Sequence, residues 1–74
     1  MKTPVVTDQA PAAIGPYSQG IAAEGLVFVS GQLPIDPATG PMPEDVAAQA
    51  KQSLANVKAV LEAGGSSMDK VVKT

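Results

Sequence analysis

"YSQGIAAEGLVFVSGQLPI", residues 17–35, contains two strand patterns in succession. Its first part alternates between two sides of a strand, and one side carries Tyr17, Gln19, Ile21 and Ala23. Its second part opens with the continuous apolar run "LVFV" and is typical of a buried strand that continues to Ile35. Glu24 and Gly25 lie between the two parts and can form a tight turn. The stretch therefore predicts an antiparallel β-hairpin.

The segments on either side of this hairpin add a strand and two loops. Residues 3–7, "TPVVT", can form a short strand in which a proline is tolerated at a sheet edge. Residues 8–16 are predicted to be a loop because Pro11, Gly15 and Pro16 interrupt them. The run from Asp36 to Gly40 fits a type I turn with proline at its second position.

A helix is predicted between Pro43 and the Gly64–Gly65 pair. Pro43 suits the first helical position, and the acidic residues after it complement the positive end of the helix dipole. The glycine pair is a typical C-terminal stop signal. One apolar stripe at helical spacing is predicted to be core, and it consists of Val46, Ala50, Leu54, Val57 and Leu61.

The last residues favour a further strand because Val71, Val72 and Thr74 are β-branched. We therefore expect a ββαβ order within an α+β fold. The sequence stops inside that strand, so residues 1–74 are expected to be a single partial domain with an unsatisfied sheet edge.

Composition excludes several classes of protein. The 74 residues allow one domain at most, and the absence of cysteine and histidine excludes disulfides and histidine-bearing metal sites. All basic residues are lysines and the net charge is −2, which argues against a nucleic-acid binder that relies on a basic surface. No secretory signal is visible, and "LVFV" is far too short to cross a bilayer. We expect a soluble cytoplasmic protein with no membrane partner.

Three residues stand out as candidates for a binding site. Tyr17 follows a Gly-Pro pair that fixes the entry direction of its ring, so it is either a core aromatic or the wall of a cleft. Ser30 and Gly31 end an apolar run, where they either form a simple strand-end turn or bind a ligand carboxylate. Ser30 is not expected to be a nucleophile, because the chain has no histidine to act as its base.

Three segments together resemble the N-terminal part of the RidA (YjgF-like) family of reactive intermediate deaminases. They are "APAAIGPYSQGI" at 10–21, "VSGQLPIDPATG" at 29–40 and "DVAAQAKQSLANVKAVLEAGGSSMDKVVKT" at 45–74. The resemblance implies a chorismate-mutase-like α/β fold with a mixed sheet packed on helices, and a homotrimer with clefts between subunits. It also implies hydrolysis of 2-imino and 2-enamino acids, such as 2-aminoacrylate and 2-iminobutanoate, to 2-oxo acids and ammonia, with no cofactor and no metal.

The same resemblance implies that Tyr17, Ser30 and Gly31 contact the substrate. The family's carboxylate-binding arginine and a cleft glutamate lie in a second half, so the catalytic residues are expected beyond residue 74. Whether this chain is itself an enzyme is therefore left open. Two alternatives remain: a non-enzymatic trimeric protein that binds small ligands or regulates, and the endoribonuclease or translation inhibitor of older family labels.

Overall fold

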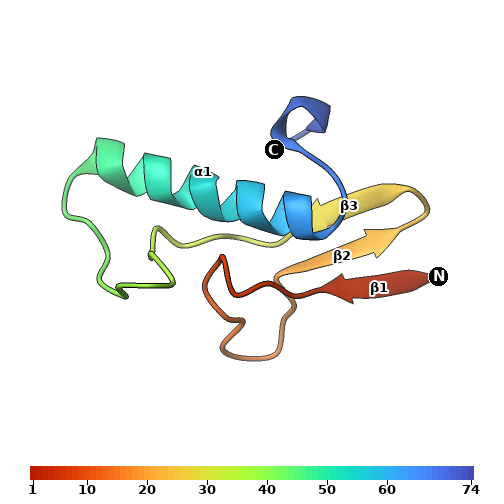
Figure 1. The fold of residues 1–74 in the computed structure, drawn as a ribbon, viewed down its shortest axis with the longest axis horizontal. Coiled ribbons are helices and arrows are strands. Elements are labelled where there is room, and N and C mark those ends of the chain that lie inside the picture. The colour runs from red at the N-terminus through yellow and green to blue at the C-terminus, as the bar shows by residue number, and fades with distance from the viewer.

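A computed structural model describes all residues 1–74 and consists of a small antiparallel sheet with one long helix (Figure 1). The strands are β1 (Lys2–Val5), β2 (Gly20–Ala23) and β3 (Leu26–Val29), in the order β1-β2-β3. They are followed by α1 (Val46–Ala63) and a 3₁₀ turn, η1 (Met68–Lys70). The α+β class predicted from the sequence is confirmed.

The predicted hairpin is present, and β2 and β3 pair from Ala23↔Leu26 to Gly20↔Val29. Glu24 and Gly25 form its two-residue turn with φ angles of 52° and 77°, as a type I′ turn requires. The strands are shorter than predicted, since neither Tyr17 nor the segment from Ser30 to Ile35 belongs to a strand. Before β2, the N–H of Tyr17 donates to the carbonyl of Gly15 at 2.9 Å, which closes a local turn.

The prediction that "LVFV" is buried throughout is wrong. Leu26 and Phe28 are 54% and 58% exposed, whereas Val27 and Val29 are partly buried. The helix covers one face of the sheet only, so apolar side chains on the other face stay accessible. The first strand also differs from its prediction, because it ends at Val5 rather than at residue 7.

The helix begins at Val46, three residues later than the predicted start at Pro43, with Asp45 as its N-cap. The Asp45 carboxylate accepts a hydrogen bond from the N–H of Ala48 at 3.2 Å, which satisfies one free donor of the first turn. At the other end the N–H of Ser66 donates to the carbonyl of Leu61 at 2.8 Å, and Gly65 has a φ of +87°. This left-handed glycine confirms the predicted stop.

The core lies where α1 crosses the helix-facing side of the sheet. Val5, Ala10 and Val60 form its buried centre. Gly20 allows this close approach, because a Cβ atom built there would lie 2.9 Å from both the Phe28 carbonyl oxygen and Val60 Cγ1. The close packing of Val60 against β2 therefore depends on a residue without a side chain.

The predicted apolar stripe of α1 is only partly buried. Leu61 is buried, but Val46 and Leu54 are 76% and 54% exposed, and Ala50 is exposed. The N-terminal half of the helix extends past the three strands and lies over the segment that follows β3 (Figure 1). The prediction that the whole stripe is core is therefore wrong for this part of the helix.

The turn at Asp36 is confirmed, while the last predicted strand is not. The N–H of Thr39 donates to the Asp36 carbonyl at 3.2 Å, and the N–H of Ala38 donates to its carboxylate at 2.8 Å. Residues 71–74 form no strand because no neighbouring strand pairs with them, so the ββαβ order is replaced by βββα. None of the helices combines the length and the apolar character needed to pass through a membrane.

Candidate functional site

Gln19, just before β2, anchors the loop that leads to Tyr17. Its side chain is almost completely buried, with 3% exposed. Its Oε1 accepts a hydrogen bond from the N–H of Thr7 at 2.8 Å, and its Nε2 lies 3.0, 3.3 and 2.7 Å from the carbonyl oxygens of Thr7, Ala10 and Pro11. An amide has two N–H donors, so these three carbonyls share them. One side chain thus joins the start of the loop to its end.

Ser30, one of the predicted contacts, lies at the end of β3 and is joined to the same loop. Its N–H donates to the carbonyl of Gln19 at 3.1 Å, which extends the hairpin ladder by one pair. Its Oγ lies 2.8 Å from that carbonyl and also contacts the carbonyl of Ser18. A hydroxyl has a single proton, so the Ser30 Oγ shares it between the carbonyls of Ser18 and Gln19 and keeps its lone pairs as acceptors.

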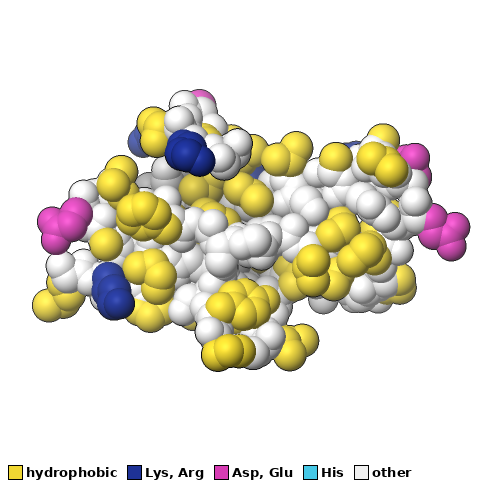
Figure 2. All heavy atoms as spheres, turned by 180° about the vertical axis from the view of Figure 1, so that it is seen from behind, with side chains coloured by type: hydrophobic (Ala, Val, Ile, Leu, Met, Phe, Trp, Pro, Cys, Tyr) yellow, Lys and Arg dark blue, Asp and Glu magenta, His cyan; other side chains and the backbone are white.

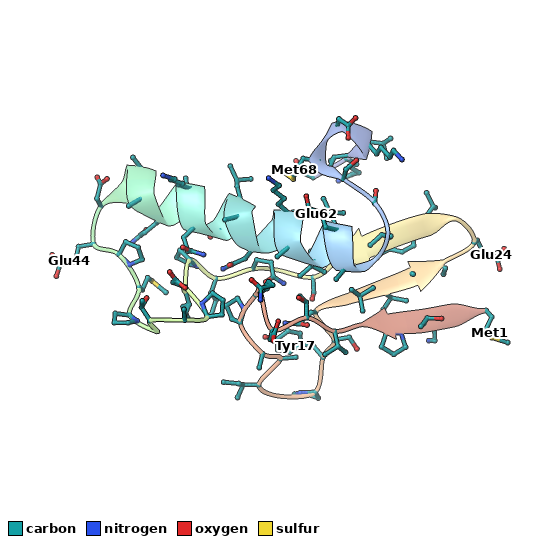
Figure 3. All side chains as sticks on the ribbon, viewed as in Figure 1. Met1, Tyr17, Glu24, Glu44, Glu62 and Met68 are labelled. Atoms are coloured by element: carbon teal, nitrogen blue, oxygen red, sulfur yellow. The ribbon has the colours of Figure 1, made fainter.

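Tyr17 stands on the loop rather than in the core. Its side chain is 48% exposed, and its hydroxyl makes no hydrogen bond within the chain. Figure 3 places it at the end of the sheet away from Met1 and Glu24. Gly15, with a φ of +116°, provides the left-handed residue of the turn before it. The ring and its hydroxyl are therefore free to meet a group from outside the chain.

Gly31 is also open. Its φ is not in the left-handed region, and a Cβ atom built on it would meet nothing within 4 Å. Its N–H makes no hydrogen bond within the chain. Nothing inside these 74 residues therefore requires glycine at this position, and its N–H is available to a ligand.

An open groove of about 1070 Å³ runs beside β3 and includes two of the three predicted residues. Its walls come from β3 and the residues after it, the C-terminal half of α1 and the last residues of the chain. Ser30 and Gly31 line the groove, but Tyr17 does not. The chain thus joins Ser30 to the Tyr17 loop through backbone contacts, without enclosing all three residues in one cavity.

The groove is mainly apolar and its charges are few. Lys70, Lys73 and Glu24 are the charged residues of its lining. No group of three or more acidic side chains lies close enough to hold a metal ion. Figure 2 shows that apolar side chains cover much of the rear face of the molecule, with isolated lysines between them.

Sequence reasoning did not identify a second buried amide, that of Asn56 on α1. Its side chain is 1% exposed, and its Nδ2 donates to the carbonyls of Leu33 and Ile35 at 2.8 and 2.9 Å. Its Oδ1 accepts from Gln52 Nε2 at 2.9 Å, so the whole side chain is satisfied. The signal was the spacing of four between Asn56 and Val60, which puts the amide on the buried face of the helix.

The family model described as Endoribonuclease L-PSP matches residues 7–74. Across all 74 residues, the chain is 54% identical to the 2-iminobutanoate/2-iminopropanoate deaminase of Salmonella typhimurium and covers 58% of its length. Two Escherichia coli crystal structures superpose closely on 95% of the chain, over 55% of their own lengths. They are the YjgF gene product, with a TM-score of 0.92 and 51% identity, and TdcF with bound serine, with a TM-score of 0.91 and 47% identity.

The chain thus spans little more than half the length of the curated relatives that it matches. The alignment with the Salmonella protein extends over the whole chain, and the superposition on the YjgF gene product covers 95% of it. The chain belongs to the RidA family of reactive intermediate deaminases, whose family model is described as Endoribonuclease L-PSP.

Proposed function

We propose that this chain supplies part of a site that hydrolyses 2-imino and 2-enamino acids to 2-oxo acids and ammonia. The observation that carries the proposal is the 54% identity, over all 74 residues, to a protein named 2-iminobutanoate/2-iminopropanoate deaminase. The hydroxyl of Tyr17 and the N–H of Gly31 support it, because both are donors that make no hydrogen bond within the chain.

The chemistry needs orientation and proton transfer rather than a covalent bond to the protein. An enamine first takes a proton at carbon 3 and becomes an imine. Water then adds to the imine carbon, the carbon–nitrogen bond breaks, and ammonia leaves as the carbonyl forms. A bound imine held beside a water and a proton donor is sufficient for this sequence.

Each candidate residue has a role that fits its geometry. The N–H of Gly31 can donate to the substrate carboxylate, as backbone donors do at oxyanion sites. Tyr17 lies outside the groove that Ser30 and Gly31 line, but its half-exposed ring can form a wall of a cleft completed by further protein, and its hydroxyl can donate to or accept from a molecule bound there. Ser30, whose proton is engaged with backbone carbonyls, can contribute acceptor lone pairs and the shape of the strand end.

The carboxylate anchor and the proton-transfer group are proposed to come from outside these residues. The chain has no arginine, which is the side chain best suited to bidentate carboxylate binding. We propose that the rest of the family domain supplies these groups and that the whole domain assembles as a homotrimer. Exposed Leu26 and Phe28, on the sheet face that α1 leaves open, support association with further protein.

A hybrid enzyme tests the proposal. Residues 1–74 would replace the matching region of the Salmonella deaminase, and 2-iminobutanoate would be generated in place by a threonine dehydratase. We expect the hybrid to speed ammonia release as the intact Salmonella protein does, and a Tyr17→Ala hybrid to be much slower. A folded hybrid with no effect on ammonia release would overturn the proposal.

The description of the family model favours a second candidate, an endoribonuclease. A net charge of −2 and the absence of arginine and histidine weigh against strong RNA contacts and against general-base catalysis by histidine. RNA binding by the purified chain that weakens steeply with added salt, together with cleavage, would support this candidate. Binding of 2-oxo acids without turnover would instead support the non-enzymatic ligand-binding alternative.

A further inference from the structure

The loop that carries Tyr17 leaves β1 after Val5 and returns at Gly20, and its tip has only local contacts of its own. The N–H of Tyr17 bonds to the carbonyl of Gly15, and Ile14 is 89% exposed. A loop with so exposed a tip has many accessible conformations unless other groups restrain it. The position of Tyr17 must therefore be fixed from the base of the loop.

Gln19 provides the first restraint. Its amide contacts Thr7, Ala10 and Pro11 on the outgoing arm, while its own backbone belongs to the returning arm, two residues after Tyr17. Ala10, held on the outgoing arm, is 2% exposed and packs in the core with Val5 and Val60. The amide therefore joins the returning arm to a part of the loop that is already fixed.

Ser30 provides the second restraint from the opposite direction. Its N–H and its Oγ bind the carbonyl of Gln19, and the Oγ also contacts the carbonyl of Ser18, the residue next to Tyr17. These contacts hold the backbone directly after Tyr17 against the end of β3. The two restraints meet on the Ser18–Gln19 step.

We propose that Gln19 and Ser30 are positioning residues that hold the base of this loop and thereby set the orientation of Tyr17. The inference rests on the proposed function, which gives Tyr17 its part in substrate binding. It assigns Ser30 a role beyond direct contact with a substrate. Gln19, which touches no candidate ligand position, becomes a determinant of the same site.

The chain has a built-in probe for this proposal. Tyr17 is its only tyrosine and it has no tryptophan, so tyrosine fluorescence and the near-ultraviolet circular dichroism of tyrosine report on this one ring. We expect Gln19→Leu to lose most of the tyrosine dichroism and to raise acrylamide quenching toward the value measured in urea. Far-ultraviolet dichroism of the same sample would show that α1 persists.

Asn56→Leu is the matched control for a loss of stability alone. Asn56 is an equally buried amide with bonds to backbone carbonyls, but it holds a different segment, at Leu33 and Ile35. We expect this variant to lower the unfolding midpoint while the folded protein keeps the Tyr17 signal. Gln9→Leu changes an exposed glutamine in the same loop and is expected to alter neither.

Ser30 gives a second pair of variants, which decides the question if Gln19→Leu does not fold. Ser30→Ala removes the Oγ contacts but keeps the N–H bond to Gln19, so a partial loss of the Tyr17 signal is expected. Ser30→Thr keeps a hydroxyl and is expected to restore the signal. Equal signals in Ser30→Ala and the unchanged chain, with Gln19→Leu unfolded, would overturn the proposal.

An unchanged Tyr17 signal in folded Gln19→Leu would also overturn it, and so would an equal loss in Asn56→Leu at matched stability. The spectra need no substrate, so they are independent of the proposed deamination. An inactive hybrid deaminase would remove the proposed function and leave the spectral result as it stands.

Discussion

The two edges of the sheet differ, and the difference shows in which direction the sheet can grow. Ser30 and Gln19 form a hydrogen-bonded pair at the end of the hairpin. Hydrogen-bonded and non-hydrogen-bonded pairs alternate along antiparallel strands, so Phe28 and Ile21 form the next hydrogen-bonded pair. The backbone groups of Val27 and Val29 therefore point out of the sheet on the free side of β3. The same alternation turns Pro4 outward on the free side of β1, where it has no N–H to offer.

The β1 edge is thus blocked against a further strand, while the β3 edge is open. Natural proteins use proline and charged residues to blunt an edge, and β1 has both Pro4 and Lys2. β3 has neither and lies beside the apolar groove. Strand pairing can therefore extend the sheet on the β3 side only, the side on which Ser30 and Gly31 lie.

The largest expected effect comes from the central strand that both edges share. Gly20→Val would place a side chain against the Phe28 carbonyl and Val60. Even a single Cβ atom at this position would lie only 2.9 Å from the Phe28 carbonyl oxygen and from Val60 Cγ1. We expect a loss of about 3 kcal/mol or more, at the upper end for overpacking, and a chain that no longer folds. Urea unfolding followed by circular dichroism measures this effect.

Gly31→Ala is the matched control for that substitution. A Cβ atom at Gly31 meets nothing within 4 Å, so the free energy of unfolding should change by about 0.5 kcal/mol at most. A stable Gly20→Val variant would show that helix and sheet do not pack as closely as described.

A smaller effect, confined to the β3 side, is expected from Asn56→Leu. The substitution leaves the part-buried carbonyls of Leu33 and Ile35 without their donor, which costs about 1–2 kcal/mol. Hydrogen exchange should quicken in residues 30–36 more than in β1. Uniform quickening throughout the sheet would contradict a local role for Asn56.

The smallest effect on folding is expected when the outward N–H group is removed from one edge strand and added to the other. These two substitutions also test the difference between the edges most directly. Val27→Pro removes an outward N–H from β3, and Pro4→Val gives one back to β1. We expect concentration-dependent association in sedimentation velocity to fall with the first variant and to rise with the second. The unfolding free energy of Pro4→Val should stay within about 0.5 kcal/mol of the unchanged chain.

Val27→Ala is the control for the side chain lost in Val27→Pro, since Val27 packs beside Gly64. It keeps the N–H and should therefore associate as the unchanged chain does. Equal association in the alanine and proline variants would show that the β3 edge is not the site of contact.

Local signals in the sequence predicted most of the elements and their boundaries at turns. The Glu24–Gly25 turn and the stop at Gly64–Gly65 were correct because each depends on residues that accept positive φ. The predictions of a fully buried helix stripe and of a strand at residues 71–74 were wrong in part. Burial needs a surface that covers the side chain, and a strand needs a second strand to pair with, and neither is present at these positions. Pattern alone shows which side chains are apolar, not which surface covers them.

For the candidate site too, the residues with local sequence signals were predicted, and those whose roles depend on distant contacts were not. Tyr17, Ser30 and Gly31 follow from turn chemistry and the family resemblance, and their contact with a substrate stays a prediction. The roles of Gln19 and Asn56 depend on carbonyls that lie far away in the sequence, and the residues next to each amide in the chain do not identify these partners. Their burial became evident only from the packed structure.

The two buried amides also imply an order of events in folding. The bonds of the Gln19 side chain join residues 8–12 apart in the chain, whereas those from Asn56 to the carbonyls of Leu33 and Ile35 join residues 23 and 21 apart. Closing a shorter loop costs less entropy, so the hairpin with its Gln19 contacts can form before the helix docks. Weakening Gln19 should therefore mainly slow folding, and weakening Asn56 should mainly speed unfolding, as stopped-flow measurements on the two variants would show.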